Sequence, residues 1–168
     1  MERRQALRIE PETAKPRQER IRHRSGRPSL ILYLDTSSLI KLYVEESGSR
    51  DVETLVAAAS LVCTSVVAYP EARSALARIH REGGLTSEEH TLTKANLDED
   101  WPDYLAIEVT PAVWRAAGDL AETHALRGFD SLHLASFLHL AGEDLGEPVR
   151  FSSFDDRLSG AARAETGP

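Results

Sequence analysis

Cysteine is nearly absent from this sequence: Cys63 is the only one among 168 residues, and it lies in the apolar stretch LVCTS. A disulfide framework is therefore excluded, and we expect the thiol to be buried as a small hydrophobic group. Long apolar runs are also missing, since none approaches the roughly 20 residues that a membrane-spanning helix needs. The arginine-rich start is followed by no apolar signal segment, so we expect a cytoplasmic protein with no membrane partner.

Positive charge is scarce outside the first 29 residues. Those residues hold nine Lys or Arg and four Asp or Glu, a net charge of +5, whereas the rest of the chain carries −12. Three prolines, few aliphatic residues and no amphipathic period are typical of a solvated tail. We interpret residues 1–29 as a basic, disordered extension or as a product of a wrongly chosen translation start. An arm that grips nucleic-acid phosphates is the alternative.

Short apolar runs alternate with helical patterns from Leu30 onward. Runs at 30–34, 61–65, 105–109 and 149–153 predict four strands, and their alternation with helices is typical of a parallel sheet. The length is sufficient for one domain with a sizeable core. The sequence therefore predicts an α/β fold, a three-layer α/β/α sandwich around a mainly parallel, Rossmann-like sheet of four to five strands. The domain is expected over residues 30–163, with a short tail at 164–168.

Capping residues and prolines place several helix ends. Two helices separated by Gly48 are expected over 37–46 and 49–59. Another helix is expected to begin at Pro70, and Thr86 has a glutamate three residues later, the spacing of a capping box. Thr110 and the proline after it mark a further helix start. The apolar segment after Gly128 has hydrophobic residues on most sides, which predicts a helix at the centre of the core.

Most acids after residue 29 lie on faces that water reaches. Four others lie at the ends of predicted strands or the starts of predicted helices, next to apolar segments, where a charged side chain is less expected. Asp35 ends the first strand, Glu71 opens a helix, Asp130 begins the most apolar helix, and Asp155 follows the last strand. Each could simply cap a helix or complement its dipole. Together they would meet at the carboxyl edge of a parallel sheet, where a divalent cation would relieve their repulsion. Oxygen ligands without cysteine or histidine favour Mg²⁺, or Mn²⁺, over zinc.

The acids belong to blocks that resemble a known family. YLDTSSLIKLYVEE, EARSALARIHRE, LRGFDSLHLA and FSSFDDRL are similar, in order and spacing, to the four acidic blocks of PIN-domain ribonucleases, most closely the VapC-type toxins of type II toxin-antitoxin systems. The resemblance covers about residues 30–163. It implies that the four acids bind metal and are catalytic, with the hydroxyls of Ser37 and Ser153 in support. Asp156 is a lesser rival to Asp155, which has the family's spacing to Leu158.

The same resemblance implies a function. It implies a Mg²⁺-dependent endoribonuclease that hydrolyses RNA phosphodiester bonds, a cognate antitoxin protein that neutralises it, and a homodimer packed through helices. Basic side chains that could line the RNA path are Lys41, Arg73, Arg78, Arg81 and Arg127. We interpret His133, inside DSLHLA, as a satisfied core histidine rather than a ligand, because no partner at metal-ligand spacing accompanies it.

Two other functions stay open. A PIN fold that binds RNA or metal without turnover is encouraged by Pro70 directly before Glu71, a departure from the family pattern. A metal-dependent phosphatase is disfavoured, because the first strand is followed by DTS and lacks the second aspartate of a DxD motif. For the nuclease, replacing Asp35 with Asn is predicted to abolish cleavage and to leave the fold intact or more stable, since one repelling carboxylate is removed.

Overall fold

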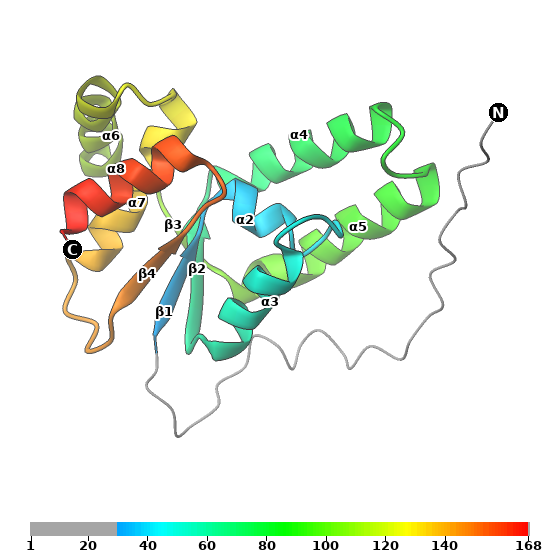
Figure 1. Ribbon diagram of the computed structural model, residues 1–168, viewed down its shortest axis with the longest axis horizontal. Helices are drawn as coiled ribbons and strands as arrows, with labels where there is room; N and C mark the ends of the chain where they lie inside the picture. Colours follow the sequence, from blue (N-terminus) through cyan, green and yellow to red (C-terminus); the bar gives the residue numbers. More distant parts are fainter. Residues whose placement is uncertain (1–29, 168) are drawn as a thin grey trace.

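The computed structural model describes residues 30–167. The extension predicted for residues 1–29 lies outside this range. Within it, four strands and seven α-helices form three layers, α/β/α, as the sequence predicts (Figure 1). The termini of the described chain lie at β1 and just after α8.

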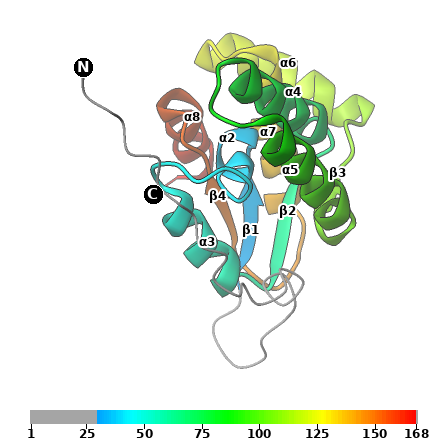
Figure 2. The same cartoon turned by 90° about the vertical axis from the view of Figure 1, so that its right-hand side faces the viewer.

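The sheet is parallel throughout and has the strand order β3-β2-β1-β4. Its strands are β1 (Ile31–Leu34), β2 (Leu61–Ser65), β3 (Leu105–Ile107) and β4 (Val149–Ser152). All four predicted strands are present, and β3 ends two residues earlier than expected. Because β1 is a central strand and has helices on both faces, all four of its residues are buried. Because all four strands are parallel, their carboxyl ends lie at one edge of the sheet, where α2 begins (Figure 2).

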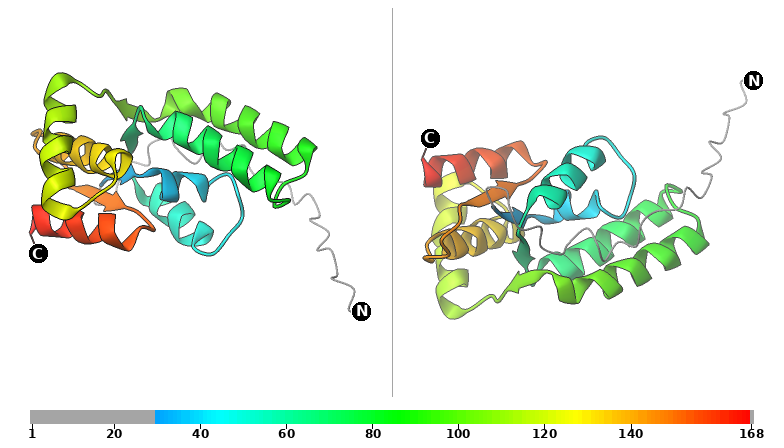
Figure 3. Two further views of the ribbon diagram at one scale, coloured as in Figure 1. Left: turned by 90° about the horizontal axis from the view of Figure 1, so that it is seen from above. Right: turned by 90° about the horizontal axis from the view of Figure 1, so that it is seen from below.

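The side chains of β1 alternate between the two faces of the sheet, as a strand requires. Leu32 and Leu34 belong to a hydrophobic cluster on one face. Helices on that side are α2 (Thr36–Ile40), α3 (Ser49–Ala58), α4 (Ala68–Arg81) and α5 (Ser87–Asp100), followed by the 3₁₀ turn η1 (Trp101–Asp103). Helices α4 and α5 lie side by side and project away from the sheet (Figures 1 and 3). The predicted capping box of Thr86 and Glu89 is confirmed at the start of α5.

Ile31 and Tyr33 point to the opposite face and join the second cluster with Cys63, which is buried as expected. The helices of this layer are α6 (Pro111–His124), α7 (Gly128–Ala141) and α8 (Asp156–Thr166). Helix α7 is central, since seven of its residues are buried, whereas α6 packs against α7 through Val113 and Ala117. Helix α8 continues into the segment 164–168 that was expected as a tail.

Two predicted helix boundaries were wrong. The helix expected over 37–46 ends at Ile40, because the amides of Lys41, Leu42 and Tyr43 turn to carbonyls three residues back, at 3.2, 3.1 and 2.9 Å. Helix α4 begins at Ala68, two residues before Pro70. The proline is tolerated in the first turn, where backbone amides have no acceptor within the helix.

Helix length and polarity also bear on the membrane. In the part of the chain from 30 to 167, no helix combines the length and apolar character required to cross a bilayer.

Candidate active site

The four predicted acids line one cavity at the carboxyl edge of the sheet. Its volume is about 610 Å³, and its walls include Asp35, Glu71, Asp130 and Asp155. Each acid comes from a different segment, and each lies at the N-terminus of a helix: Asp35 caps α2, Glu71 is in the first turn of α4, Asp130 in the first turn of α7, and Asp155 caps α8. The positive end of each helix dipole favours the negative charge beside it. Helix capping holds Asp35 and Asp155, and the positions of all four acids at helix starts are compatible with their gathering in one cavity.

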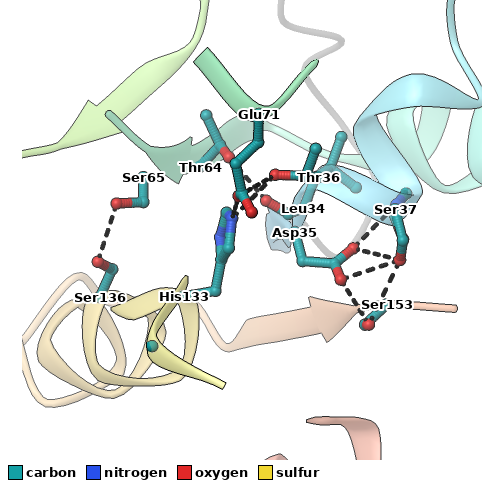
Figure 4. Close-up of polar contacts among 12 residues, drawn as sticks. Leu34, Asp35, Thr36, Ser37, Thr64, Ser65, Glu71, His133, Ser136 and Ser153 are labelled. Atoms are coloured by element: carbon teal, nitrogen blue, oxygen red, sulfur yellow. Dashed lines mark hydrogen bonds and ion pairs between the residues drawn. The ribbon is translucent and has the colours of Figure 1, made fainter. Parts of the chain in front are cut away.

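Asp35 is the most tightly held of the four, and its side chain is only 4% exposed. Its carboxylate accepts hydrogen bonds from the Ser38 amide at 2.9 Å, from the Ser37 hydroxyl at 2.8 and 2.9 Å, and from the Ser153 hydroxyl at 2.6 Å (Figure 4). Parallel pairing of β1 with β4 brings Ser153 to this position, since the Asp35 amide donates to the Ser152 carbonyl at 3.1 Å. Both predicted supporting hydroxyls therefore contact Asp35.

Glu71 is held through one of its two carboxylate oxygens. Its Oε2 accepts a hydrogen bond from the Thr36 hydroxyl at 2.6 Å and lies 2.9 Å from Nε2 of His133 (Figure 4). Burial acts to raise the pKa of Glu71, but the hydrogen bonds from His133 and Thr36 outweigh it, so the pKa lies below its ordinary value. From residues 30–167, Oε1 accepts no hydrogen bond. One oxygen of this carboxylate is fixed, and the other is left to the cavity.

His133 joins Glu71 to the core. The imidazole is 2% exposed, and its Nδ1 lies 3.1 Å from the Tyr33 hydroxyl. Burial raises the pKa of Tyr33 well above its ordinary value, so the phenol that faces Nδ1 keeps its proton. Because the pKa of Glu71 is lowered, its carboxylate accepts and Nε2 of His133 donates, and the Thr36 hydroxyl oxygen lies 3.0 Å from the same nitrogen. The prediction of a buried, satisfied histidine is confirmed, but this histidine also lines the acid cavity.

Asp130 and Asp155 interact electrostatically across the cavity. Burial raises the pKa of Asp130 most, followed by the charges of Asp155 and Glu71, whereas Arg127 opposes the rise. Asp155 uses Oδ1 to accept the Leu158 amide at 2.8 Å, which leaves Oδ2 without a hydrogen bond from the described residues. The next residue, Asp156, is exposed and is not part of the cavity wall.

The donor set of the cavity fits a hard divalent cation. All four acids offer oxygen, and the raised pKa of Asp130 indicates negative charge that a cation would offset. The arrangement is open: among residues 30–167, no three His, Cys, Asp or Glu side chains are grouped as a ready-made metal site. Side-chain rotation would therefore have to accompany binding. Oε1 of Glu71 and Oδ2 of Asp155 are two of the oxygens that need not first give up a hydrogen bond from residues 30–167.

Two of the basic residues expected along an RNA path are tied to other parts of the protein. Lys41 is only 9% exposed, and its ammonium donates to Glu46 Oε1 at 2.8 Å and to the Ser47 carbonyl at 2.7 Å. Arg73 donates to the Tyr69 hydroxyl at 2.6 Å and to Oδ1 of Asp98 on α5 at 3.2 Å. Their charges are therefore partly neutralised within the fold.

Arg78 and Arg127 differ from that pair. Both are exposed and both line the acid cavity. Neither forms a salt bridge with an acid of the described chain. Lys41 also lines the cavity, but its ammonium is paired with Glu46, whereas Arg78 on α4 and Arg127 immediately before α7 bring exposed guanidinium groups beside the acids.

Sequence reasoning missed the contacts of Thr36 and Tyr33 around Glu71. Thr36 follows Asp35 directly, and a hydroxyl beside a strand-end acid was visible in the sequence. Nothing in the sequence pointed to Tyr33, because its contact with His133 depends on which face of β1 packs against α7. Their hydrogen bonds join β1, α2, α4 and α7 at one point.

Comparison with known proteins agrees with this architecture. The profile of the family described as PIN domain matches residues 32–164. Two relatives from Mycobacterium tuberculosis, Ribonuclease VapC45 of strain CDC 1551 / Oshkosh and Ribonuclease VapC49 of strain ATCC 25618 / H37Rv, are each 38% identical over 138 residues. Each alignment covers 80% of this chain and 90% of the relative.

This chain belongs to the PIN domain family. Within that family, the resemblance to VapC-type proteins that the four acidic blocks indicate is confirmed by both relatives. The fold prediction of three α/β/α layers around a parallel sheet is confirmed as well.

Proposed function

We propose that this protein is a cytoplasmic, Mg²⁺-dependent endoribonuclease, the toxin of a type II toxin-antitoxin system that a cognate antitoxin protein neutralises. The observation that carries the proposal is the gathering of Asp35, Glu71, Asp130 and Asp155 on one cavity. The names of the two relatives, both ribonucleases matched over 90% of their length, support RNA as the substrate. The homodimer implied by the family resemblance is part of the same proposal.

The acids divide the work of holding the cation. Asp35 is fixed by three hydrogen-bond donors, so it offers a rigid anchor at the end of β1. Glu71, Asp130 and Asp155 would complete the ligand set, and Mn²⁺ fits the same oxygens. Bound Mg²⁺ supplies Lewis-acid activation of water and neutralises charge that develops at the phosphate.

Covalent catalysis by the protein is disfavoured on physical grounds. The Cys63 thiol is fully buried, and burial raises its pKa to about 12, so the thiolate is scarce at neutral pH. The hydroxyls that contact the acids donate to them and hold them in place: those of Ser37 and Ser153 to Asp35, and that of Thr36 to Glu71. Direct attack of water on the phosphodiester is therefore the favoured chemistry.

Incubation of the purified protein with total RNA tests the proposal. Discrete cuts are expected with Mg²⁺, none with EDTA, and recovery when Mg²⁺ is returned in excess. The Asp130→Asn variant, purified in parallel, is the control for contaminating nuclease and should leave the RNA intact. Cutting that persists in EDTA or in the Asp130→Asn variant would refute the metal-dependent mechanism.

A PIN fold that binds RNA or metal without turnover is the second candidate. The open arrangement of the acids in residues 30–167 is the observation that favours it. Pro70 no longer does, because it lies in the first turn of α4 and Glu71 on the same helix lines the cavity. Binding of RNA with no cut at any Mg²⁺ concentration would select this alternative.

A further inference from the structure

A groove continues from the acid cavity across the start of α7. It consists of two adjoining hollows of about 570 and 640 Å³, and both are lined by Glu71, Arg127 and Phe129. Glu71 and Arg127 also line the acid cavity, so the groove adjoins the cavity. Arg78 on α4 forms part of the opposite wall.

The charge of this groove is suited to an anion. Arg78 and Arg127 are exposed and form no salt bridge with an acid among residues 30–167. The effect of Arg127 on the pKa of Asp130 places its charge close to the acids. An anionic chain that crosses the groove would thus meet two guanidinium groups that no salt bridge holds, although the nearby acids offset part of their charge.

Phe129 supplies an apolar face to the same groove. Its side chain is 52% exposed, and its ring makes no stacking or cation contact with residues 30–167. Other exposed aromatics differ: the guanidinium of Arg115 lies 4.7 Å from the Trp114 ring, and the Lys41 ammonium lies 4.2 Å from the Phe154 ring. Phe129 is the open ring beside the acids, and it directly precedes Asp130.

We propose that this groove binds single-stranded RNA next to the bond to be cut. Arg78 and Arg127 contact its phosphates, and an unpaired base stacks on Phe129. Stacking of this kind needs a base released from a helix, so the groove selects unpaired RNA over duplex RNA. The inference rests on the proposed function, since it takes the acid cavity as the place of cleavage.

Fluorescence anisotropy with a labelled, unstructured RNA of about 12 nucleotides tests the groove, because single-strand sites of this kind span about 4–16 nucleotides. The Asp155→Asn background prevents cleavage during the measurement and keeps the α8 cap, since asparagine caps helices as well as aspartate does. In this background, Arg78→Ala and Arg127→Ala are expected to reduce the slope of log Kd against log salt by about 0.7 each. Phe129→Ala is expected to weaken binding about 5- to 100-fold with little change of slope, and Phe129→Trp to restore it.

The controls are an arginine from the same helix as Arg78 and an exposed aromatic residue from a neighbouring helix. Arg73→Ala on α4 and Trp114→Ala on α6 should leave the affinity and the slope unchanged, because Arg73 is paired and Trp114 lies outside the groove. The same RNA annealed to its complement should bind more weakly to the parent and lose no affinity with Phe129→Ala.

The outcomes separate this inference from the proposed function. Unchanged affinity and slope in Arg78→Ala, Arg127→Ala and Phe129→Ala would overturn the inference and leave the groove to a protein partner, even if the wild-type chain cuts RNA. Loss of binding in those variants together with a wild-type chain that never cuts RNA would keep the RNA groove and refute the nuclease.

Discussion

Nε2 of His133 lies 2.9 Å from Oε2 of Glu71, and the Tyr33 hydroxyl lies 3.1 Å from Nδ1 on the other side of the ring. The three side chains come from α7, α4 and β1, so one buried imidazole joins both helical layers through the sheet. Because the pKa of Glu71 is lowered and an ionised carboxylate can only accept, Nε2 of His133 donates to Glu71. This arrangement fixes one oxygen of Glu71 and leaves the other without a hydrogen bond from residues 30–167.

Removal of the imidazole should loosen Glu71. We expect His133→Ala to weaken Mn²⁺ binding and Mg²⁺-dependent cleavage about 10- to 100-fold, as is usual when a side chain that orients a metal ligand is lost. His133→Gln keeps an amide donor at a similar reach and should recover part of the loss. Isothermal titration with Mn²⁺ measures the affinity directly, and equal affinities for His133→Ala and wild type would show that the contact only fills space.

The raised pKa of Asp130 predicts how metal-free stability depends on pH. A carboxyl whose pKa is raised by folding binds its proton more tightly in the folded state than in the unfolded state. Stability is therefore lost as pH rises from the ordinary value of 3.8 through the raised value, and the deficit persists at pH 7. Asp130→Asn should raise the Tm of the metal-free protein at pH 7 and give no advantage below the ordinary pKa. Added Mg²⁺ should raise the Tm of wild type more than that of the variant.

Asp35 should behave in the opposite way, which revises the expectation from the sequence. Its carboxylate accepts hydrogen bonds from Ser37, Ser38 and Ser153, and these are stronger to a charged acceptor than to a neutral amide. Asp35→Asn is thus expected to lower the free energy of unfolding by about 1–2 kcal/mol while it abolishes cleavage. Urea unfolding of Asp35→Asn and Asp130→Asn under the same metal-free conditions compares the two signs, and stabilisation by both variants would mean that repulsion dominates at both positions.

The neighbouring pair Asp155 and Asp156 offers a sharp test of the fourth acid. Asp155 lines the cavity and Asp156 does not. Asp155→Asn should lower the cleavage rate by about 100-fold or more, the usual cost of removing an electrostatic group that acts on the reacting centre. Asp156→Asn should cleave as wild type does. A reversed result would assign the fourth ligand to Asp156.

Lys41 is predicted to support the fold and not the RNA. Its ammonium donates hydrogen bonds to the Glu46 carboxylate and to the Ser47 carbonyl, both in the loop after α2. Lys41→Ala should lower the free energy of unfolding by about 1–3 kcal/mol, the range for buried hydrogen bonds to a charged group. The salt dependence of RNA binding should stay unchanged, and a slope reduced by about 0.7 would return Lys41 to the RNA path.

Local sequence patterns were sufficient to predict most of the helices and strands. The apolar runs predicted all four strands, and the Thr86 capping box and the Thr110 cap placed two helix starts, because each depends on residues within one turn. The helix over 37–46 was predicted too long: it ends at Ile40, and Tyr43 beyond it is still buried in the core, where its hydroxyl lies 2.8 Å from that of Tyr104.

The site was predictable only in part. Strand-end position pointed to the acids, because parallel strands share one carboxyl edge. The pairing of His133 with Glu71, and the separation of Arg78 from Arg73, depend on which sides of α7 and α4 meet the cavity. Because α7 is apolar on most sides, its sequence has no clear amphipathic stripe from which the orientation of a single side chain could be predicted.

The central claim is that four carboxylates from four segments share one divalent cation, and anomalous diffraction at the manganese edge tests it most directly. In crystals soaked with Mn²⁺, the account predicts an anomalous peak in the cavity bounded by Asp35, Glu71, Asp130 and Asp155, and a much weaker peak in Asp130→Asn crystals. A map of wild-type crystals at saturating Mn²⁺ with no peak among these side chains would contradict it.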